Sequence, residues 1–335
     1  MFRPLVALSL FGIALATPYK RTDGLTVFVT GPSSSVSSID DLKFIASITN
    51  HGAETVKVLK YATILDDKLP TRSFTVTKDG EEVKFTGIKM SVSLDKAGDS
   101  AYATINPGET ITVNHDVAHL FDFATAGPGK FTFSPLANFA INSNSALSRI
   151  SAASSNIEVE VTGDVAKREL PLNKRAVDIC TDSTLKAFID GSYTEAKSLA
   201  SIGSSYVSSQ GTSDSVFEGY FGSNSASAVT SILNAVSSES SSSRTCVDDY
   251  DVCGDGVIAY TVIATTDIYY CDIFFDEVPS SNLCSGTTVA SRNIRGGTTL
   301  HELTHAVGGT DDINYGCAAD QSLSDSEKIS NADNF

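Results

Sequence analysis

The residues best suited to chemistry lie close to the C-terminus of this 335-residue chain, where His301, Glu302 and His305 form the pattern HExxH. In a helix, residues four apart lie on one face, so both imidazoles can reach a single metal ion at about 2.0–2.1 Å. Glu302 follows the first histidine, where a carboxylate can take a proton from the attacking water and pass it to the leaving amine. The pattern therefore predicts one zinc ion per chain and peptide-bond hydrolysis, with Glu302 as general base and then general acid.

HExxH also occurs by chance on amphipathic helices with solvated histidines, so its surroundings matter. Residues 176–335 contain only two histidines, and both belong to the motif. Gly308 and Gly309 end the expected helix where the chain must turn towards a third ligand, and acidic residues follow at once. These surroundings favour the metal site over the chance match.

On spacing alone, two acidic residues compete for the position of the third ligand. Asp311 stands where the metzincin pattern has its last histidine, but metzincins also need a methionine turn beneath the metal, and both methionines of the chain precede residue 176. Glu327 follows the second histidine by 22 residues, as a thermolysin-type ligand could, although Ser324 and Glu327 also match a helix capping box. Spacing alone leaves both alternatives open.

The elements that must position the motif alternate between helices and strands. A helix is expected from Asp182 or Ser183 to about residue 201, and a second one over residues 227–236. Residues 257–264 and 268–275 are strand-like, and Thr298 is the expected cap of the helix that carries HExxH. The order of two helices, a hairpin and a third helix predicts an α+β, zincin-like catalytic domain.

The first half of the chain has a different pattern, with many short runs rich in β-branched and aromatic residues. Turn residues such as Asn50-His51-Gly52 separate some of these runs. The pattern predicts an all-β, sandwich-like domain before the catalytic domain. The expected strands span residues 25–30, 42–47, 56–60, 73–77, 83–87, 110–114, 130–134 and 157–162.

The N-terminus has the features of a signal peptide. A basic start precedes an apolar run from Leu5 to Leu15, and the small-x-small triplet that ends at Ala16 is a cleavage site. A buried helix would suit Pro4 and Gly12 less well. We expect residues 1–16 to be removed on export to the extracellular space. No other run reaches the roughly 18 apolar residues of a membrane span.

A dibasic pair, Lys174-Arg175, lies five residues before the first cysteine. Charge and cysteine content change at this point, so we expect a kexin-like processing protease to cut there. The chain then divides into a propeptide, residues 17–175, and a catalytic domain, residues 176–335. The propeptide has no cysteine to block a metal, and its His115 and His119 are weak candidates for that role.

Cysteine and charge are both concentrated in the C-terminal half. Residues 176–335 hold 22 of the 40 acidic residues and 6 of the 24 basic ones, so the whole net charge of −16 belongs to them. Such a surface argues against a nucleic-acid partner and favours basic proteins, although solubility alone would also account for it. An even number of cysteines in an exported chain predicts three disulfides, with fifteen possible pairings. The candidates are Cys180, Cys246, Cys253, Cys271, Cys284 and Cys317.

At Gly309-Thr-Asp-Asp-Ile-Asn-Tyr-Gly316 the sequence resembles the deuterolysins, secreted fungal-type zinc proteases of the aspzincin clan, whose HExxH is followed by GTxDxxYG. The resemblance implies Asp312 as the third zinc ligand and Tyr315 as a residue that stabilises the transition state. It also covers the signal, the long propeptide, the dibasic junction and the Cys253–Cys271 spacing, and it implies a preference for basic substrates.

The resemblance has one departure. The closing helix and final cysteine of many deuterolysins do not follow Phe335, so we expect the catalytic domain to be C-terminally incomplete or to end early. The pairing of Cys284 and Cys317 therefore stays open. The prediction is a secreted, monomeric zinc endopeptidase made as a pro-enzyme. The alternative is a secreted binding or virulence-associated protein whose protease domain is inactive.

Overall fold

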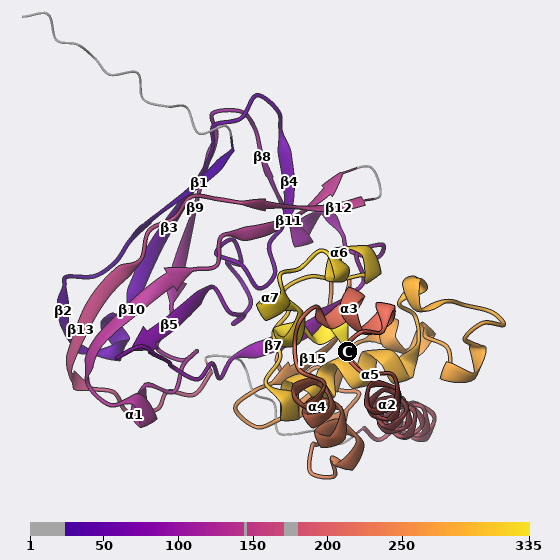
Figure 1. Ribbon diagram of the computed structural model, residues 1–335. Coiled ribbons are helices and arrows are strands. Elements are labelled where there is room, and N and C mark those ends of the chain that lie inside the picture. The colour runs from indigo at the N-terminus through magenta and orange to yellow at the C-terminus, as the bar shows by residue number, and fades with distance from the viewer. Residues whose placement is uncertain (1–23, 144–145, 171–179) are drawn as a thin grey trace, which may run out of the picture.

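A computed structural model describes residues 24–143, 146–170 and 180–335 (Figure 1). The architecture is mixed α+β, with a β-rich N-terminal half (residues 24–170) and a C-terminal half dominated by helices (residues 180–335). The expected signal peptide and the Lys174-Arg175 junction lie outside the described residues. No helix of the described ranges is long and apolar enough to span a membrane.

The N-terminal half contains several small sheets, in which neighbouring strands are antiparallel except for one parallel pair, β2 and β13. The first sheet has the order β1 (Leu25–Thr30), β3 (Lys43–Asn50), β9 (Thr110–Asp116). The second has the order β2 (Ser35–Ser38), β13 (Ile157–Asp164), β10 (Gly129–Pro135), β5 (Phe74–Lys78), β6 (Glu81–Glu82). The third has the order β12 (Ala146–Ser151), β11 (Asn138–Ser143), β4 (Val56–Leu59), β8 (Tyr102–Ile105).

Alternating side chains of the first two sheets form one shared core. In β3, Phe44, Ala46 and Ile48 are buried while the residues between them are more exposed, as a strand with one covered face requires. The ring of Phe44 lies 4.7 Å from that of Phe133 on β10, so the two sheets contact one another through aromatic side chains. Most of the expected strands are present, but residues 83–87 form no strand.

Three helices with side-chain caps dominate the C-terminal half. α2 (Ser183–Gln210), α3 (Ser215–Phe221) and α4 (Ala226–Ser238) begin after Asp182, Asp214 and Ser225, whose side chains accept bonds from the first turns. The motif helix α5 (Arg295–Leu303) begins three residues before the expected cap, Thr298, and packs against α2. The remaining helices are α1 (Phe123–Ala126) in the N-terminal half and α6 (Cys317–Gln321) and α7 (Asp325–Ser330) near the C-terminus.

A fourth sheet joins the two halves. Its order is β14 (Arg244–Thr245), β16 (Asp267–Tyr270), β15 (Val257–Val262), β7 (Ile88–Val92), and β7 is its only strand from the N-terminal half. β7 lies beside β15 (Figure 1) and pairs antiparallel with it. Met90 is opposite Tyr260 in this pairing. β7 was not among the predicted strands, although its five residues alternate between apolar and polar side chains, and in the structure all five are buried.

Two disulfides are formed, Cys180–Cys246 and Cys253–Cys271. The expectation of three is wrong, because Cys284 and Cys317 carry free thiols. Cys284 is exposed in a tight turn, where its N–H donates to the carbonyl oxygen of Thr287, and Cys317 is the first residue of α6. The two cysteines thus lie in separate local elements, a turn and a short helix. The two bridges connect elements of the C-terminal half only.

Candidate active site

The end of α5 shapes the candidate metal site. After Leu303 the helix widens into a π-helical turn, Thr304–Gly308, and Gly309 ends it with a φ of +72°, a conformation that glycine adopts at little cost. The hydroxyl of Thr304 donates to the carbonyl oxygen of His301 at 2.8 Å. His301 and His305 are buried one turn apart, so the two imidazoles converge as the HExxH spacing predicts.

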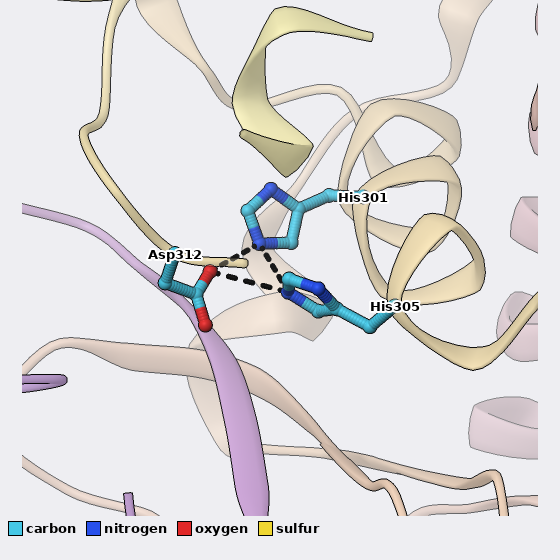
Figure 2. A group of neighbouring side chains, drawn as sticks. All are labelled: His301, His305 and Asp312. Atoms are coloured by element: carbon cyan, nitrogen blue, oxygen red, sulfur yellow. Dashed lines mark hydrogen bonds and ion pairs between the residues drawn. The ribbon is translucent and has the colours of Figure 1, made fainter. Parts of the chain in front are cut away.

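Three potential ligand atoms meet at one point (Figure 2). Oδ1 of Asp312 lies 3.0 Å from Nε2 of His301 and 3.1 Å from Nε2 of His305. The two Nε2 atoms lie 3.1 Å apart. Two imidazole nitrogens and one carboxylate oxygen form the donor set of a catalytic zinc site, which leaves a further position open for water or substrate.

Contacts behind the ligands fix their orientation. Nδ1 of His305 donates to the carbonyl oxygen of Thr310 at 2.8 Å, which leaves its Nε2 lone pair facing the site. Nδ1 of His301 lies 3.5 Å from Oδ1 of Asp333. Arg292 holds this carboxylate at 2.7 Å. Each histidine thus has an oxygen atom near the ring nitrogen that faces away from the three-atom group, hydrogen-bonded for His305 and 3.5 Å away for His301.

The charges of the group formed by His301, His305 and Asp312 also favour the binding of a cation. Burial lowers the pKa of His301, but the carboxylates of Asp312 and Asp333 outweigh burial and raise that pKa to about 10. Burial raises the pKa of Asp312, yet the two histidines outweigh it and hold that pKa far below its usual range. The group therefore keeps an ionised carboxylate beside nitrogens that attract positive charge. A divalent metal ion and a proton compete for those nitrogens.

Glu302 is fully buried on the same helix. Its Oε1 accepts a bond from the backbone N–H of Ser91 at 2.9 Å, and its Oε2 accepts from the hydroxyl of Thr261 at 2.7 Å. Burial raises the pKa of Glu302 above its ordinary value. A carboxyl with a raised pKa can take up a proton and release it again near neutral pH, as a general base and acid must.

Tyr315 is also buried beside the metal ligands. Its ring stacks near that of His301, with the centroids 6.2 Å apart, and the guanidinium of Arg292 lies over the ring at 5.2 Å. The Tyr315 hydroxyl donates to the carbonyl oxygen of Met90 on β7 at 2.9 Å. The hydroxyl is thus a hydrogen-bond donor to a peptide carbonyl inside the site.

The two rival third ligands point elsewhere. Asp311 forms ion pairs with Lys89 and Arg72 of the N-terminal half, at 2.8 Å and 2.7 Å. Glu327 pairs with Arg149 at 3.1 Å and completes the capping box of α7 with Ser324. The geometry therefore brings Asp312, and neither rival, to the two histidines. His115 and His119 also lie outside the three-residue group.

Several residues that support the site carry no motif in the sequence. Thr261 contacts the carboxylate of Glu302, and Arg292 and Asp333 form a half-buried ion pair beside His301 and Tyr315. Isolated charged residues carry no local motif, so spacing gave no sign of this pair. Thr261 lies in an expected strand, but only the sheet shows that its side chain faces Glu302.

Comparison with known proteins agrees with this geometry. A family model described as deuterolysin metalloprotease (M35) matches residues 6–335. A neutral protease 2 homologue of Pyricularia oryzae is 31% identical over 318 residues, which cover 90% of this chain and 88% of the relative. Penicillolysin of Penicillium citrinum is 28% identical, with 90% and 88% covered. Peptidyl-Lys metalloendopeptidase of Armillaria mellea is 27% identical, with 96% and 92% covered.

Among solved structures, a zinc peptidase from Grifola frondosa is 25% identical and covers 46% of this chain and 92% of its own, with a TM-score of 0.36. The HExxH helix and the His-His-Asp group define the class as a zinc metalloendopeptidase. The family match over most of the chain is more specific: this chain belongs to the deuterolysin metalloprotease family.

Proposed function

We propose that the protein is the precursor of a secreted endopeptidase that hydrolyses internal peptide bonds, with His301, His305 and Asp312 as zinc ligands. The convergence of their three ligand atoms within hydrogen-bonding distance carries the proposal. When bound, zinc would polarise the scissile carbonyl and lower the pKa of the attacking water. The remaining chemistry belongs to side chains of this chain.

Glu302 acts first as general base and then as general acid. Its carboxylate takes the proton of the attacking water and passes it to the amine that leaves when the C–N bond breaks. Tyr315 donates its hydroxyl hydrogen to the oxygen that gains negative charge in the transition state. Thr261 holds Glu302 in place through its 2.7 Å bond to Oε2.

Maturation and location complete the proposal. Residues 1–16 direct export, a kexin-like protease cuts after Arg175, and residues 176–335 act outside the cell as a monomer. The two disulfides support an oxidising compartment, where such bridges persist. The acidic C-terminal half favours basic protein substrates, and one relative is named for cleavage at lysyl residues. We propose no nucleic-acid or membrane partner.

The first prediction tests the role of Glu302. A Glu302→Gln variant should keep its zinc but lose nearly all hydrolysis of casein, because the amide preserves the hydrogen bonds and cannot carry the proton. General acid–base catalysis contributes roughly a hundredfold to ten-thousandfold, so a loss of that size is expected. Metal analysis of the same preparation is the control. Substantial activity in this variant would contradict the mechanism.

The alternative function, a secreted binding protein with an inactive protease domain, makes a different forecast. If this alternative holds, purified wild-type protein that has been cut after Arg175 and carries one zinc ion per chain should not hydrolyse casein. The intact His301, Glu302 and His305 favour the enzyme over this alternative.

A further inference from the structure

Strand β7 lies in the active site in the way an extended peptide substrate would. It is the edge strand of the fourth sheet and pairs antiparallel with β15, so that Lys89 lies opposite Thr261 and Met90 opposite Tyr260. Without β7, the edge of β15 would offer unpaired backbone groups to another peptide. Addition of an extended peptide to such an edge is a common mode of peptide recognition.

The peptide bond between Met90 and Ser91 has the surroundings of a scissile bond. The carbonyl oxygen of Met90 accepts from the hydroxyl of Tyr315 at 2.9 Å, and the N–H of Ser91 donates to Oε1 of Glu302 at 2.9 Å. The N–H of Met90 donates to Oδ2 of Asp312 at 2.7 Å. Tyr315, which donates a hydrogen bond, thus faces the carbonyl oxygen. Glu302, which carries the proton, faces the nitrogen that would leave. These contacts define which side chain occupies which place in the site.

In this register, Lys89 is the second residue on the N-terminal side of the central bond. Its side chain is buried, with 8% exposure, and its ammonium group donates to the carbonyl oxygen of Thr310 at 2.5 Å and pairs with Oδ1 of Asp311 at 2.8 Å. A buried ammonium group needs such partners, because removing the charge from water is costly. The acceptors belong to the C-terminal half, so they would persist after the N-terminal half leaves.

The backbone around Asp311 holds this acceptor in place independently of Lys89. The N–H of Asp311 donates to the carbonyl oxygen of Ser330 at 2.6 Å, and its carbonyl oxygen accepts from the N–H of Ala332 at 3.0 Å. Asp311 also accepts a bond from Arg72 at 2.7 Å. Two cations of the N-terminal half thus meet one carboxylate that directly precedes Asp312. A lysine or an arginine can each satisfy it.

We propose that Asp311 determines specificity by binding the lysine or arginine side chain of a substrate at the second residue before the scissile bond. In the precursor, β7 fills this place with Lys89 and covers the reacting groups with its backbone, so it acts as an internal, substrate-like inhibitor. The inference rests on the proposed endopeptidase function and adds to it a subsite and a source of latency. Neither His115 nor His119 takes part.

A double-mutant cycle tests the contact without any turnover. The full chain carrying Glu302→Gln is cut after Arg175 with a kexin-like protease, and the Kd between its two segments is measured by sedimentation at serial dilutions. Lys89→Met and Asp311→Asn should each raise the Kd roughly tenfold or more, since a buried charged hydrogen bond contributes that much. The double variant should be little worse than Asp311→Asn alone, because that change already removes the acceptor of Lys89 together with that of Arg72.

Two matched controls separate this contact from a general loss of charge. Lys89→Arg keeps the positive charge and should restore most of the affinity. The exposed pair Lys96–Asp276 also joins the two halves, at 2.9 Å, so Lys96→Met and Asp276→Asn should change the Kd only slightly. Additive effects of Lys89→Met and Asp311→Asn would overturn the assigned contact.

Peptide cleavage then tests the specificity. The cut wild-type chain should hydrolyse a peptide with lysine at the second position before the scissile bond at least about tenfold better, in kcat/KM, than the same peptide with norleucine. Asp311→Asn should reduce that ratio towards one, and Asp276→Asn should preserve it. Cleavage with no preference for lysine overturns this inference alone, whereas zinc-loaded protein that cleaves no peptide overturns the proposed function together with it.

Discussion

At the scale of single residues, the site depends on adjacent aspartates that face in different directions. Oδ1 of Asp312 contacts both histidines, whereas the carboxylate of Asp311 contacts Lys89 and Arg72. The motif HExxH with GTxDxxYG was sufficient to predict the three-residue group. Spacing alone could not separate the two aspartates, because the turn after Gly309 decides which side chain faces the histidines.

The aspartates should therefore differ in their effect on zinc. Asp312→Asn should weaken zinc binding by more than about a hundredfold, a larger loss than removal of a supporting residue causes. Asp311→Asn should change it by less than about tenfold, since this carboxylate touches neither histidine. Competition with a chelator of known affinity measures both. The reverse ranking would support the metzincin-like spacing.

At the scale of elements, α5 and its surroundings place the reactive groups. Its helical nature could be predicted from the motif, but its start could not, because α5 has no side-chain cap and begins after Ile294. β7 could not be predicted as part of the site. The sequence Ile88–Val92 alternates between apolar and polar residues as a strand does, but its position depends on pairing with β15, which lies far along the chain.

A buried carboxyl under α5 makes the stability of this element depend on pH. Glu277 accepts a bond from the hydroxyl of Thr298 at 2.8 Å, while its Oε2 has no hydrogen-bond partner among the described residues, and burial raises its pKa from 4.5 to about 8. Between these values the folded state holds a proton that the unfolded state has lost. The stabilisation is complete below about pH 4.5 and disappears as pH rises through about 8.

Glu277→Gln should remove this dependence. The amide oxygen can still accept the Thr298 bond and carries no charge, so the variant should unfold several degrees higher than wild type at about pH 9 and at nearly the same temperature at about pH 4. Thermal unfolding at the two pH values measures the difference. Asp272→Asn, an exposed neighbour, should shift neither value. An equal shift at both pH values would show that Glu277 is not protonated in the folded state.

At the scale of the whole molecule, the two halves carry complementary charges where they meet. In every ion pair that joins them within the described ranges, the cation comes from the N-terminal half and the anion from the C-terminal half. The uneven charge could be read from the sequence, but the sites of pairing could not. The pairs are Arg72–Asp311, Lys89–Asp311, Lys96–Asp276 and Arg149–Glu327.

This arrangement bears on maturation. If the N-terminal half is a propeptide, secreted protein should begin at Ala176, which N-terminal sequencing would show directly. Active protein that still carries residues 17–175 in one chain would contradict both the cleavage site and the inhibitory role of β7. A Lys174→Ala, Arg175→Ala precursor should accordingly remain inactive on casein.

Departure of the N-terminal half would leave Asp311, Asp276 and Glu327 without their basic partners, on a domain whose net charge is −16. The resulting negative potential should speed the encounter with basic proteins. Salt should reduce this advantage, because the Debye length falls from about 10 Å at 0.1 M to about 3 Å at 1 M.

The last prediction follows from this potential. We expect kcat/KM for a histone-like protein to exceed that for an acidic protein of similar disorder at low salt, and the ratio to fall as salt rises. A direct contact between a substrate lysine and Asp311 should be screened less than attraction over a distance, so a part of the preference should persist at 1 M salt in wild type and disappear in Asp311→Asn. A ratio near one at low salt would show that the charge only keeps the protein soluble.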